Sequence, residues 1–319
     1  MLTLTMRPYR GEADLEAIAH LFNTCAAFDR VERWISVNEV RLALEMPSFD
    51  PTRDIRLWED GEGKLIGIGG MRILESGEEI DGSFWFRVHP NASRSELGRK
   101  IIAWGEQRMR EVDPKPGVRV KLLCSSRDDN RERIALLESC GFTSERFFFN
   151  MERSLLDPFP KSQFPEGFTL RNSKGEQDSE AWTEMRNQSF IDHWNYHVWQ
   201  VERYRQFLTD PNYKPELDLI AVAPDGKFAA FCLCYINPEE NQQIGRKDGW
   251  INMIVTRRGF RRIGLGRAML LAGLHQLKVA GMETAKLGVD GDNPNGALQL
   301  YESVGFRKVH TNISYFKYV

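Results

Sequence analysis

Cysteine is scarce in this chain, and its spacing excludes the structures that cysteine usually builds. The 319 residues include five cysteines, an odd number, and none of them form a C-x-x-C motif. A disulfide framework or a cysteine-based zinc site would need paired cysteines at short, regular spacings. We therefore predict free thiols, no bound metal and a reducing compartment, the cytoplasm.

Long hydrophobic runs and an excess of charge of one sign are also missing. No apolar stretch approaches the roughly 20 residues that a helix needs to cross a bilayer, and the N-terminal segment lacks the apolar core of a secretory signal. Lysine and arginine (43) nearly balance aspartate and glutamate (45), which leaves a formal net charge of −2. Bulk electrostatics gives no reason to expect a nucleic-acid or membrane partner.

An internal repeat accounts for the length of the chain. At a shift of 164, four residues near the start of each copy recur: Arg7, Gly11, Glu12 and Asp14 as Arg171, Gly175, Glu176 and Asp178. The same shift relates the far ends: Leu136, Glu138, Ser139, Gly141 and Phe142 recur as Leu300, Glu302, Ser303, Gly305 and Phe306. Between them, Leu97, Gly98, Arg99 and Gly105 match Leu265, Gly266, Arg267 and Gly273 at a shift of 168. Two copies of one domain are indicated, 1–156 and 167–319, joined by a proline-rich linker, 157–166.

Each copy shows the same order of predicted elements. A first strand and helices are followed by a hairpin with an Asp-Gly turn, a central strand, a glycine-containing turn, a helix, a strand, a last helix and a terminal strand. The terminal strands are predicted at 147–151 and 313–319. This order is typical of an α/β (α+β) fold, with a mixed sheet flanked by helices in each copy.

The most informative segment is the turn between a strand and an apolar helix at 255–266, VTRRGFRRIGLG. Glycines allow backbone N–H groups to point inward, and the N-terminus of the following helix adds partial positive charge. The surrounding cations are Arg257, Arg258, Arg261, Arg262 and Arg267. A guest that carries phosphates is therefore predicted. The spacing lacks the third glycine of a dinucleotide-binding fingerprint and the Lys-Ser or Lys-Thr of a P-loop.

A second motif follows at 292–306, DNPNGALQLYESVGF. Asn293 and Asn295 lie where an N-cap would open the last helix, and Gly305 where a C-cap would close it. Together with Arg261-x-x-Gly264-x-Gly266, this segment resembles the two signatures of the GNAT superfamily of acyl-CoA-dependent N-acetyltransferases. The two motifs also stand in the usual order and at the usual distance.

The resemblance implies two tandem GNAT domains, each with a mixed, mostly antiparallel sheet flanked by helices, and acetyl-CoA as cosubstrate. The tandem layout is similar to that of the mycothiol synthase family, in which the C-terminal copy is active. The strand before the turn would present main-chain groups to the pantetheine, and the turn would hold the pyrophosphate. The cofactor-binding residues implied in this way are Met253, Ile254, Val255, Phe260, Arg261, Arg262, Ile263, Gly264, Leu265, Gly266, Asn293, Ala297 and Tyr301.

The same resemblance implies a catalytic acid and leaves the general base open. Tyr301 matches the tyrosine that protonates the leaving thiolate, and Asn293 either contacts the pantetheine or caps the last helix. The position at which the family often keeps an acid on the central strand is Gly249, and the neighbouring Asp248 is the candidate base, or a solvated residue at the start of the strand. A second candidate set for the base or the acceptor pocket is Glu184, Asp192, His193 and Trp194.

The N-terminal copy departs from both motifs. Glu96 replaces Gly264, which adds a β-carbon and a negative charge where pyrophosphate would approach. Leu137 replaces Tyr301 and cannot donate a proton. We therefore assign catalysis to the C-terminal copy and a structural role to the N-terminal one.

The predicted reaction is acetyl transfer from acetyl-CoA to the primary amine of a small molecule. Two alternatives remain at this point: a protein or peptide N-acetyltransferase, and a non-catalytic acyl-CoA-binding sensor. The expected partner is thus a small-molecule amine, with no nucleic acid and no membrane, and the chain is expected to be a monomer or a homodimer.

Overall fold

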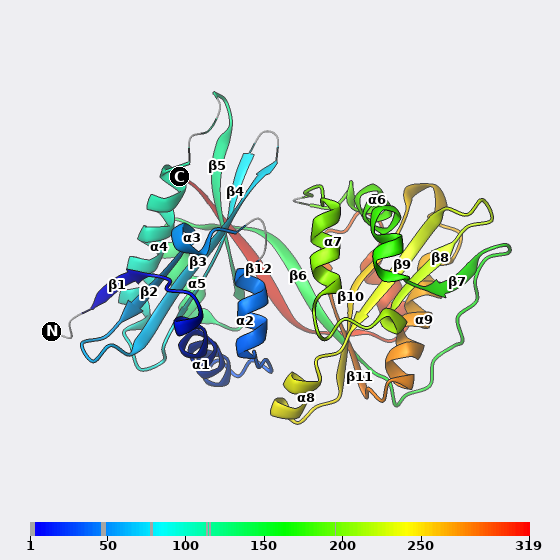
Figure 1. Ribbon diagram of the computed structural model, residues 1–319, viewed down its shortest axis with the longest axis horizontal. Coiled ribbons are helices and arrows are strands. Elements are labelled where there is room, and N and C mark those ends of the chain that lie inside the picture. The colour runs from blue at the N-terminus through cyan, green and yellow to red at the C-terminus, as the bar shows by residue number, and fades with distance from the viewer. Residues whose placement is uncertain (1–3, 46–48, 77–78, 113, 115, 195) are drawn as a thin grey trace. The chain divides into compact units, whose positions relative to one another are not determined.

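The computed structural model describes residues 4–45, 49–76, 79–112, 114, 116–194 and 196–319. The chain divides into two compact units, each made of strands and helices (Figure 1). Unit 1 consists of Met1–Phe147 and Asn312–Val319, and unit 2 of Phe148–Thr311. The units therefore differ from the contiguous ranges 1–156 and 167–319 that the repeat predicts, for a reason given by the strand pairing below.

Unit 1 is built on a mixed sheet with the strand order β1-β2-β3-β4-β5-β12. Neighbouring strands are antiparallel except β4 and β5, which are parallel. The strands are β1 (Thr5–Pro8), β2 (Ile55–Glu59), β3 (Leu65–Ser76), β4 (Glu79–Val88), β5 (Arg119–Arg127) and part of β12 (Arg307–Tyr318). The helices are α1 (Glu12–Phe28), α2 (Val37–Leu44), α3 (Pro51–Asp54), α4 (Arg94–Arg110) and α5 (Arg131–Ser139).

Unit 2 repeats this plan, with the strand order β6-β11-β10-β9-β8-β7 and one parallel pair, β10 and β11. The strands are part of β6 (Thr143–Ser154), β7 (Thr169–Asn172), β8 (Asp218–Val222), β9 (Phe228–Tyr235), β10 (Asp248–Thr256) and β11 (Thr284–Asp290). The helices are α6 (Ser179–Phe190), α7 (Val201–Leu208), α8 (Pro238–Ile244), α9 (Leu265–Val279) and α10 (Ala297–Ser303), with short 3-10 turns η1 (Gly175–Asp178), η2 (Pro215–Leu217) and η3 (Arg258–Phe260). The predicted mixed, mostly antiparallel sheets with flanking helices are confirmed.

The two units exchange their terminal strands. Residues 148–154 of β6 pair with β11 in unit 2, although β6 begins in unit 1. Residues 312–318 of β12 pair with β5 in unit 1, although β12 begins in unit 2. The sequence predicts both strands but places each in its own copy. Because the copies share one pattern, each sheet offers an edge that either strand can complete, and local sequence does not choose between them.

Helices cover both faces of the unit 2 sheet, and alternate residues of β9 pack against different helices. Cys232 and Cys234 lie beneath α9, where the glycine at 273 permits close contact: a β-carbon there would lie 2.6 Å from the Cys232 sulfur. Phe231 belongs to a buried cluster on the opposite face, with Trp182 of α6. Because alternate residues of β9 are buried on opposite faces, packing fixes the orientation of this strand in the sheet. β9 pairs with β10, along which the candidate site lies.

Candidate active site

A cavity forms in unit 2 where the parallel strands β10 and β11 part. The two strands are paired only from Asp248 and Thr284 to Trp250 and Lys286. Immediately beyond, the pairing of β10 with β9 shifts register between Ile251 and Met253, which leaves Asn252 as a bulge. A bulge bends a strand and ends regular pairing. The strands therefore diverge, and a cavity of about 470 Å³ opens between them.

The walls of the cavity come from elements that are far apart in the sequence. The lining comprises Ser189 and Phe190 at the end of α6, His193 after it, residues 251–256 of β10, Arg261, Arg262, Gly264, Gly266 and Arg267 of the turn and α9, residues 287–290 of β11, and Asn293, Asn295, Gly296, Ala297, Leu300 and Tyr301 of the second motif. Backbone groups of the diverging strands, a helix N-terminus and a buried phenol thus face one space.

The turn before α9 presents unpaired backbone N–H groups to this cavity. Arg262 and Gly264 have φ angles of 65° and 87°, and α9 begins at Leu265 without a side-chain cap. The first N–H groups of an uncapped helix are available to an anion. A β-carbon on Gly264 would meet no atom within 4 Å, so the glycine is required by its positive φ and not by crowding from the protein.

The five arginines around the turn are not equivalent. Arg257 forms an ion pair of 2.6 Å with Glu184, while Arg258 and Arg261 both bind Asp192. Hydrogen bonds from these two guanidiniums hold the pKa of the Asp192 carboxyl well below its usual range, and the bond from Arg258 has the larger effect. Arg262 and Arg267 line the cavity, and within the described part of the chain no carboxylate is paired with either.

Arg261 connects the turn to its surroundings. Its Nε donates to the Thr256 carbonyl at 3.0 Å, and its Nη2 to the Ser189 carbonyl at 2.9 Å. Its Nη1 donates to the Asp192 carboxylate and, at 3.0 Å, to Asn295 Oδ1. These bonds tie β10, the end of α6 and the second motif together, so the guanidinium fixes the geometry of the turn with little capacity left for a ligand.

In the second motif, the residue that precedes the last helix differs from the predicted one. The helix α10 begins at Ala297 after Gly296, which has a φ of 74° and provides no side-chain cap. Asn293 Oδ1 accepts a hydrogen bond from the backbone N of Asn295 at 2.9 Å. The prediction that Asn293 or Asn295 caps the last helix is therefore wrong, because Asn293 closes a turn of its own.

Tyr301 is a buried phenol at the cavity. Only 7% of its surface is exposed, and its ring lies edge-on to Phe306 at 6.1 Å. No described residue hydrogen-bonds its hydroxyl. Burial, followed by the neighbouring Cys232, raises the pKa of Tyr301 above its ordinary value, so the side chain stays a neutral proton donor at physiological pH.

Comparisons with known proteins agree with this geometry. Residues 179–306, which include every lining residue of the cavity, match the profile described as "Acetyltransferase (GNAT) family". A mycothiol acetyltransferase from Kineococcus radiotolerans is 31% identical over 267 residues, which are 81% of this chain and 78% of that protein. The chain belongs to the GNAT acetyltransferase family.

This GNAT acetyltransferase has relatives over nearly its full length. A mycothiol acetyltransferase from Thermobispora bispora is 28% identical over 315 residues, 98% of this chain and 99% of the relative. The crystal structure of a GCN5-related N-acetyltransferase from Sphaerobacter thermophilus has the same fold, with a TM-score of 0.75, 24% identity and coverage of 99% of this chain and 95% of that one. The predicted family, an acyl-CoA-dependent N-acetyltransferase, is confirmed.

Some predicted residues of the GNAT turn lie outside the cavity. Phe260 packs its ring edge-on against Phe168 at 5.8 Å, Ile263 is exposed, and Leu265, the first residue of α9, is buried in the core of unit 2. The residues between and beside them, Arg261, Arg262, Gly264 and Gly266, line the cavity. The motif spacing identifies the segment correctly but does not distinguish these orientations.

Asp248, the candidate base, is held away from the cavity. It is buried at the start of β10, where its carboxylate lies 2.6 Å from Lys286 Nζ and 2.9 Å from Arg246 Nε. Gly249 also faces inward, since a β-carbon on it would lie 2.5 Å from Leu277 of α9. Neither position borders the cavity, because both precede the bulge in β10. We therefore remove Asp248 from the candidate catalytic residues.

The acceptor-pocket candidates separate into three environments. Asp192 anchors two arginines of the turn, and Trp194 packs against Phe148 at 5.6 Å. His193 alone of the three lines the cavity. Glu184 forms the ion pair with Arg257 described above.

Sequence reasoning missed the residues of β11 and of the bulge. Asp290 is buried, lines the cavity and accepts a hydrogen bond from the backbone of Asp292 at 3.1 Å. Asn252 is exposed at the bulge in β10, just beyond the last residue of β10 that pairs with β11. A usable signal exists for β11, because the ends of two adjacent parallel strands meet at one edge of a sheet. None exists for the bulge, since no residue type marks it.

Two wider observations complete the description of this GNAT acetyltransferase. Within the described residues, no helix is both long and apolar enough to cross a membrane. In the same part of the chain, no cluster of three or more histidine, cysteine, aspartate or glutamate side chains has a metal-binding arrangement.

Proposed function

We propose that unit 2 transfers an acetyl group from acetyl-CoA to the primary amine of a small molecule, with both substrates bound at once. The observation that carries this proposal is the cavity between β10 and β11, which joins an anion-binding helix N-terminus to a buried phenol. Such a space suits a long cosubstrate with phosphates at one end and a reactive thioester at the other.

The parts of the cavity fit the parts of acetyl-CoA. The N–H groups at the start of α9 would hold the pyrophosphate together with Arg267 and Arg262, whose guanidinium donates one hydrogen bond to the Asn295 carbonyl at 3.3 Å. The backbone of β10 from Met253 to Val255, freed from β11, offers donors and acceptors to the amides of the pantetheine. Asn293 and Ala297 line the same space. Acetyl-CoA supplies the activated acyl group, and no metal is needed for this transfer.

Tyr301 is the proposed acid. Amine attack on the thioester carbonyl gives a tetrahedral oxyanion, and its collapse breaks the C–S bond and releases a thiolate. The phenol is kept protonated by burial, so it can give its proton to the sulfur as that bond breaks. Its position on α10, one turn after Ala297 at the cavity wall, supports this role.

Unit 1 lacks the corresponding anion site. The last residue of β4, Val88, matches Thr256 at the shift of 168, yet α4 begins at Arg94, whereas the start of α9 would correspond to residue 97 (265 − 168). The helix therefore starts three residues earlier and absorbs Glu96, which pairs with Lys100 at 3.0 Å. No glycine turn is left to receive a phosphate.

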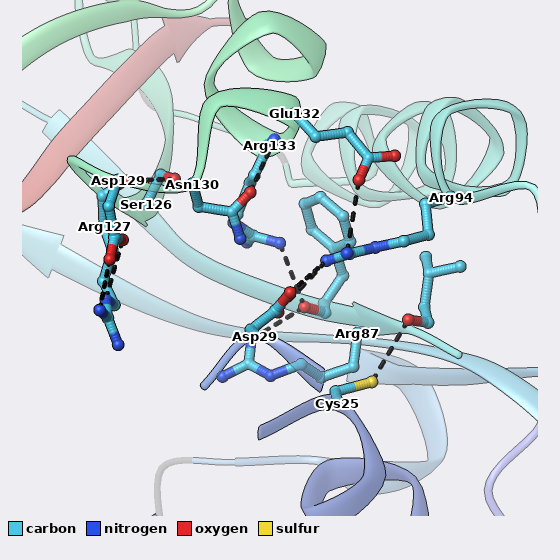
Figure 2. A network of polar contacts seen from close by, with 12 residues as sticks. Cys25, Asp29, Arg87, Arg94, Ser126, Arg127, Asp129, Asn130, Glu132 and Arg133 are labelled. Carbon is cyan, nitrogen blue, oxygen red and sulfur yellow. Dashed lines mark hydrogen bonds and ion pairs between the residues drawn. The ribbon is translucent and has the colours of Figure 1, made fainter. Parts of the chain in front are cut away.

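Arginine side chains bind the strands of unit 1 where β4 and β5 part. β4 and β5 stay paired only as far as Ser83 and Leu123. Beyond this point, Arg133 donates to the carbonyls of Ser125 on β5 and Phe86 on β4, at 2.8 Å and 3.4 Å. Figure 2 shows Arg133 in this network, with Arg94 between Asp29 and Glu132. Arg133 corresponds to Ala297 at the shift of 164. This guanidinium takes the strand carbonyls that pantetheine would use, which supports a structural role for unit 1.

The acceptor is the least determined part of the proposal. The relatives reported above are named mycothiol acetyltransferases, which makes their acceptor the first amine to test. Against that assignment, the central-strand acid expected for the mycothiol synthase family is replaced by Gly249, whose α-carbon faces the core. A cavity of this size, with Phe190 and His193 at its wall, favours a small acceptor over a protein. We place the enzyme in the cytoplasm, as a monomer or a homodimer.

The experiment is a CoA-release assay on a panel of amines that includes the acceptor of the mycothiol acetyltransferases, simple amino sugars and a peptide with a free N-terminus. Tyr301→Phe is expected to lower kcat about 10- to 100-fold while leaving the Kd of acetyl-CoA nearly unchanged. Tyr315→Phe, a buried tyrosine of unit 1, is the matched control. Acetyl-CoA binding without turnover for any amine would instead identify a sensor, and turnover of the peptide alone a peptide acetyltransferase.

A further inference from the structure

His193 occupies a fixed position at the cavity wall, set by its neighbours in the chain. Its backbone N donates to the Phe190 carbonyl at 2.8 Å, which closes a turn at the end of α6. The preceding residue, Asp192, is bound by Arg258 and Arg261 of the phosphate turn. The loop that carries the imidazole is therefore attached to the same turn that begins α9.

The hydrogen bonding of the ring determines which nitrogen carries the proton. His193 Nδ1 lies 2.9 Å from the backbone oxygen of Trp194. A carbonyl oxygen can only accept, so Nδ1 is the protonated nitrogen of the neutral ring and Nε2 keeps its lone pair. Among the described residues none hydrogen-bonds Nε2. The Phe190 ring, 5.3 Å away, packs against the imidazole and limits its rotation.

We propose that His193 is the general base of the acetyl transfer, a role that rests on the proposed function. Nε2 removes one proton from the acceptor ammonium and passes it to solvent. The freed lone pair forms the C–N bond to the acyl carbon, the C–S bond breaks, and Tyr301 protonates the sulfur. The nitrogen loses a second proton as the amide forms, and this proton restores the phenol. The products are the N-acetyl amide, CoA and one proton in solution.

The contacts of four carboxylates in and near the site support His193 over each of them as the base. Asp248 is engaged by Lys286 and Arg246 outside the cavity. Glu184 and Asp192 are engaged by arginines of the turn. Asp290 lies at the cavity but already accepts a backbone hydrogen bond at the end of β11. His193 is thus the cavity residue with both an oriented ring and an available basic nitrogen.

The tautomer can be tested without any acceptor. In long-range ¹H–¹⁵N spectra of the full-length protein, the His193 signals are assigned by their loss in His193→Gln. We expect a protonated Nδ1 and a bare Nε2 in the neutral ring. A protonated Nε2 would overturn the proposal even if the enzyme proves active, because that nitrogen could not accept a proton.

Kinetics with the best acceptor then test the role. His193→Gln and His193→Ala are expected to lower kcat about 100-fold or more, with the Kd of acetyl-CoA within about threefold of the wild type and partial rescue of the alanine variant by added imidazole. His275→Gln, an exposed histidine of α9, is the control and should retain wild-type kcat. A loss that resides in acetyl-CoA affinity, or a kcat within about threefold of wild type, would show that His193 only contacts the cosubstrate. Absence of turnover in the wild type with every amine would refute the proposed function instead, and the tautomer spectrum would still stand as a separate result.

Discussion

At the scale of single residues, the charges around the phosphate turn are divided between structure and ligand. Glu184 and Asp192 form ion pairs with three of the five arginines, whereas Arg262 and Arg267 line the cavity. The sequence predicts the basic cluster correctly. It cannot predict the division, because the carboxylates lie 66 to 73 residues away from their arginines along the chain.

This division predicts which arginines matter for cosubstrate affinity. Arg262→Ala and Arg267→Ala should each raise the Kd of acetyl-CoA about 10- to 100-fold, since a charge-assisted hydrogen bond contributes about 1.5–3 kcal/mol. Arg257→Ala removes the same charge from a residue that is outside the cavity lining and should change Kd less than threefold. Calorimetric titration of the three variants at one ionic strength compares them. Equal losses in all three would mean that the turn acts only through its net charge.

A buried carboxylate in unit 2 predicts a pH dependence of stability. Asp218 on β8 accepts hydrogen bonds from Trp182, Tyr204 and Tyr213, yet burial outweighs these and raises its pKa from 3.8 to about 6. Between these two values the folded state binds more protons than the unfolded state. The contribution of protonated Asp218 to the free energy of unfolding is therefore fully present below pH 4 and is lost as the pH rises through 6.

The measurement is the free energy of unfolding from pH 4 to 7. Relative to Asp218→Asn, the wild type should lose about 3 kcal/mol of stability over this range, because one pKa unit corresponds to about 1.4 kcal/mol. Parallel curves for the two proteins would contradict the raised pKa.

At the scale of elements, the same helix begins differently in the two units, and this difference separates a binding turn from a filled one. In unit 2 a glycine at positive φ precedes α9, whereas in unit 1 the helix α4 extends over the corresponding residue. Periodicity predicts both helices. The residue at which each helix begins depends on the backbone conformation and side-chain contacts of single residues, which periodicity does not predict. For this reason the N-cap of α10 is Gly296 and not the predicted Asn293.

Substitutions at Gly264 separate the conformational effect from the electrostatic one. Gly264→Ala should cost about 1–2 kcal/mol of stability through its positive φ, with a moderate loss of acetyl-CoA affinity, because its β-carbon meets no protein atom. Gly264→Glu should abolish detectable binding by adding a carboxylate at the phosphates. Gly259→Glu, which adds the same charge on η3 outside the cavity lining, is the control. Affinity measured by calorimetry, beside thermal stability, distinguishes the outcomes, and unchanged affinity in Gly264→Glu would disprove the anion site.

At the scale of the whole molecule, the two units differ where their parallel strands part: unit 2 has a cavity there, whereas in unit 1 Arg133 binds the strand carbonyls. We expect a binding stoichiometry of one acetyl-CoA per chain, reduced to zero by Gly264→Glu. Arg133→Ala should leave the wild-type stoichiometry unchanged, because the early start of α4 still removes the phosphate turn. A stoichiometry of two in calorimetry would contradict the structural role of unit 1.

The repeat predicts the duplication and the order of elements, and the two motifs predict the family, but the repeat places each terminal strand in the wrong unit. Phe148 and Tyr315 illustrate the limit. Each lies in a segment correctly predicted as a strand, but Phe148 pairs with β11 of unit 2 and Tyr315 with β5 of unit 1. Pairing partners at such separations are decided by the assembled sheets, and the local pattern carries no information about them.

The exchange of strands also sets the order in which the protein can fold during synthesis. Residues 312–319 follow all of unit 2 in the chain, yet they complete the sheet of unit 1, most of which is made first. Unit 2, by contrast, receives its contribution from β6 before its own strands are synthesised. During synthesis the edge of β5 in unit 1 therefore stays without its partner strand until unit 2 has been made, and a stop codon shortly before residue 312 would damage the unit that is encoded farthest from it.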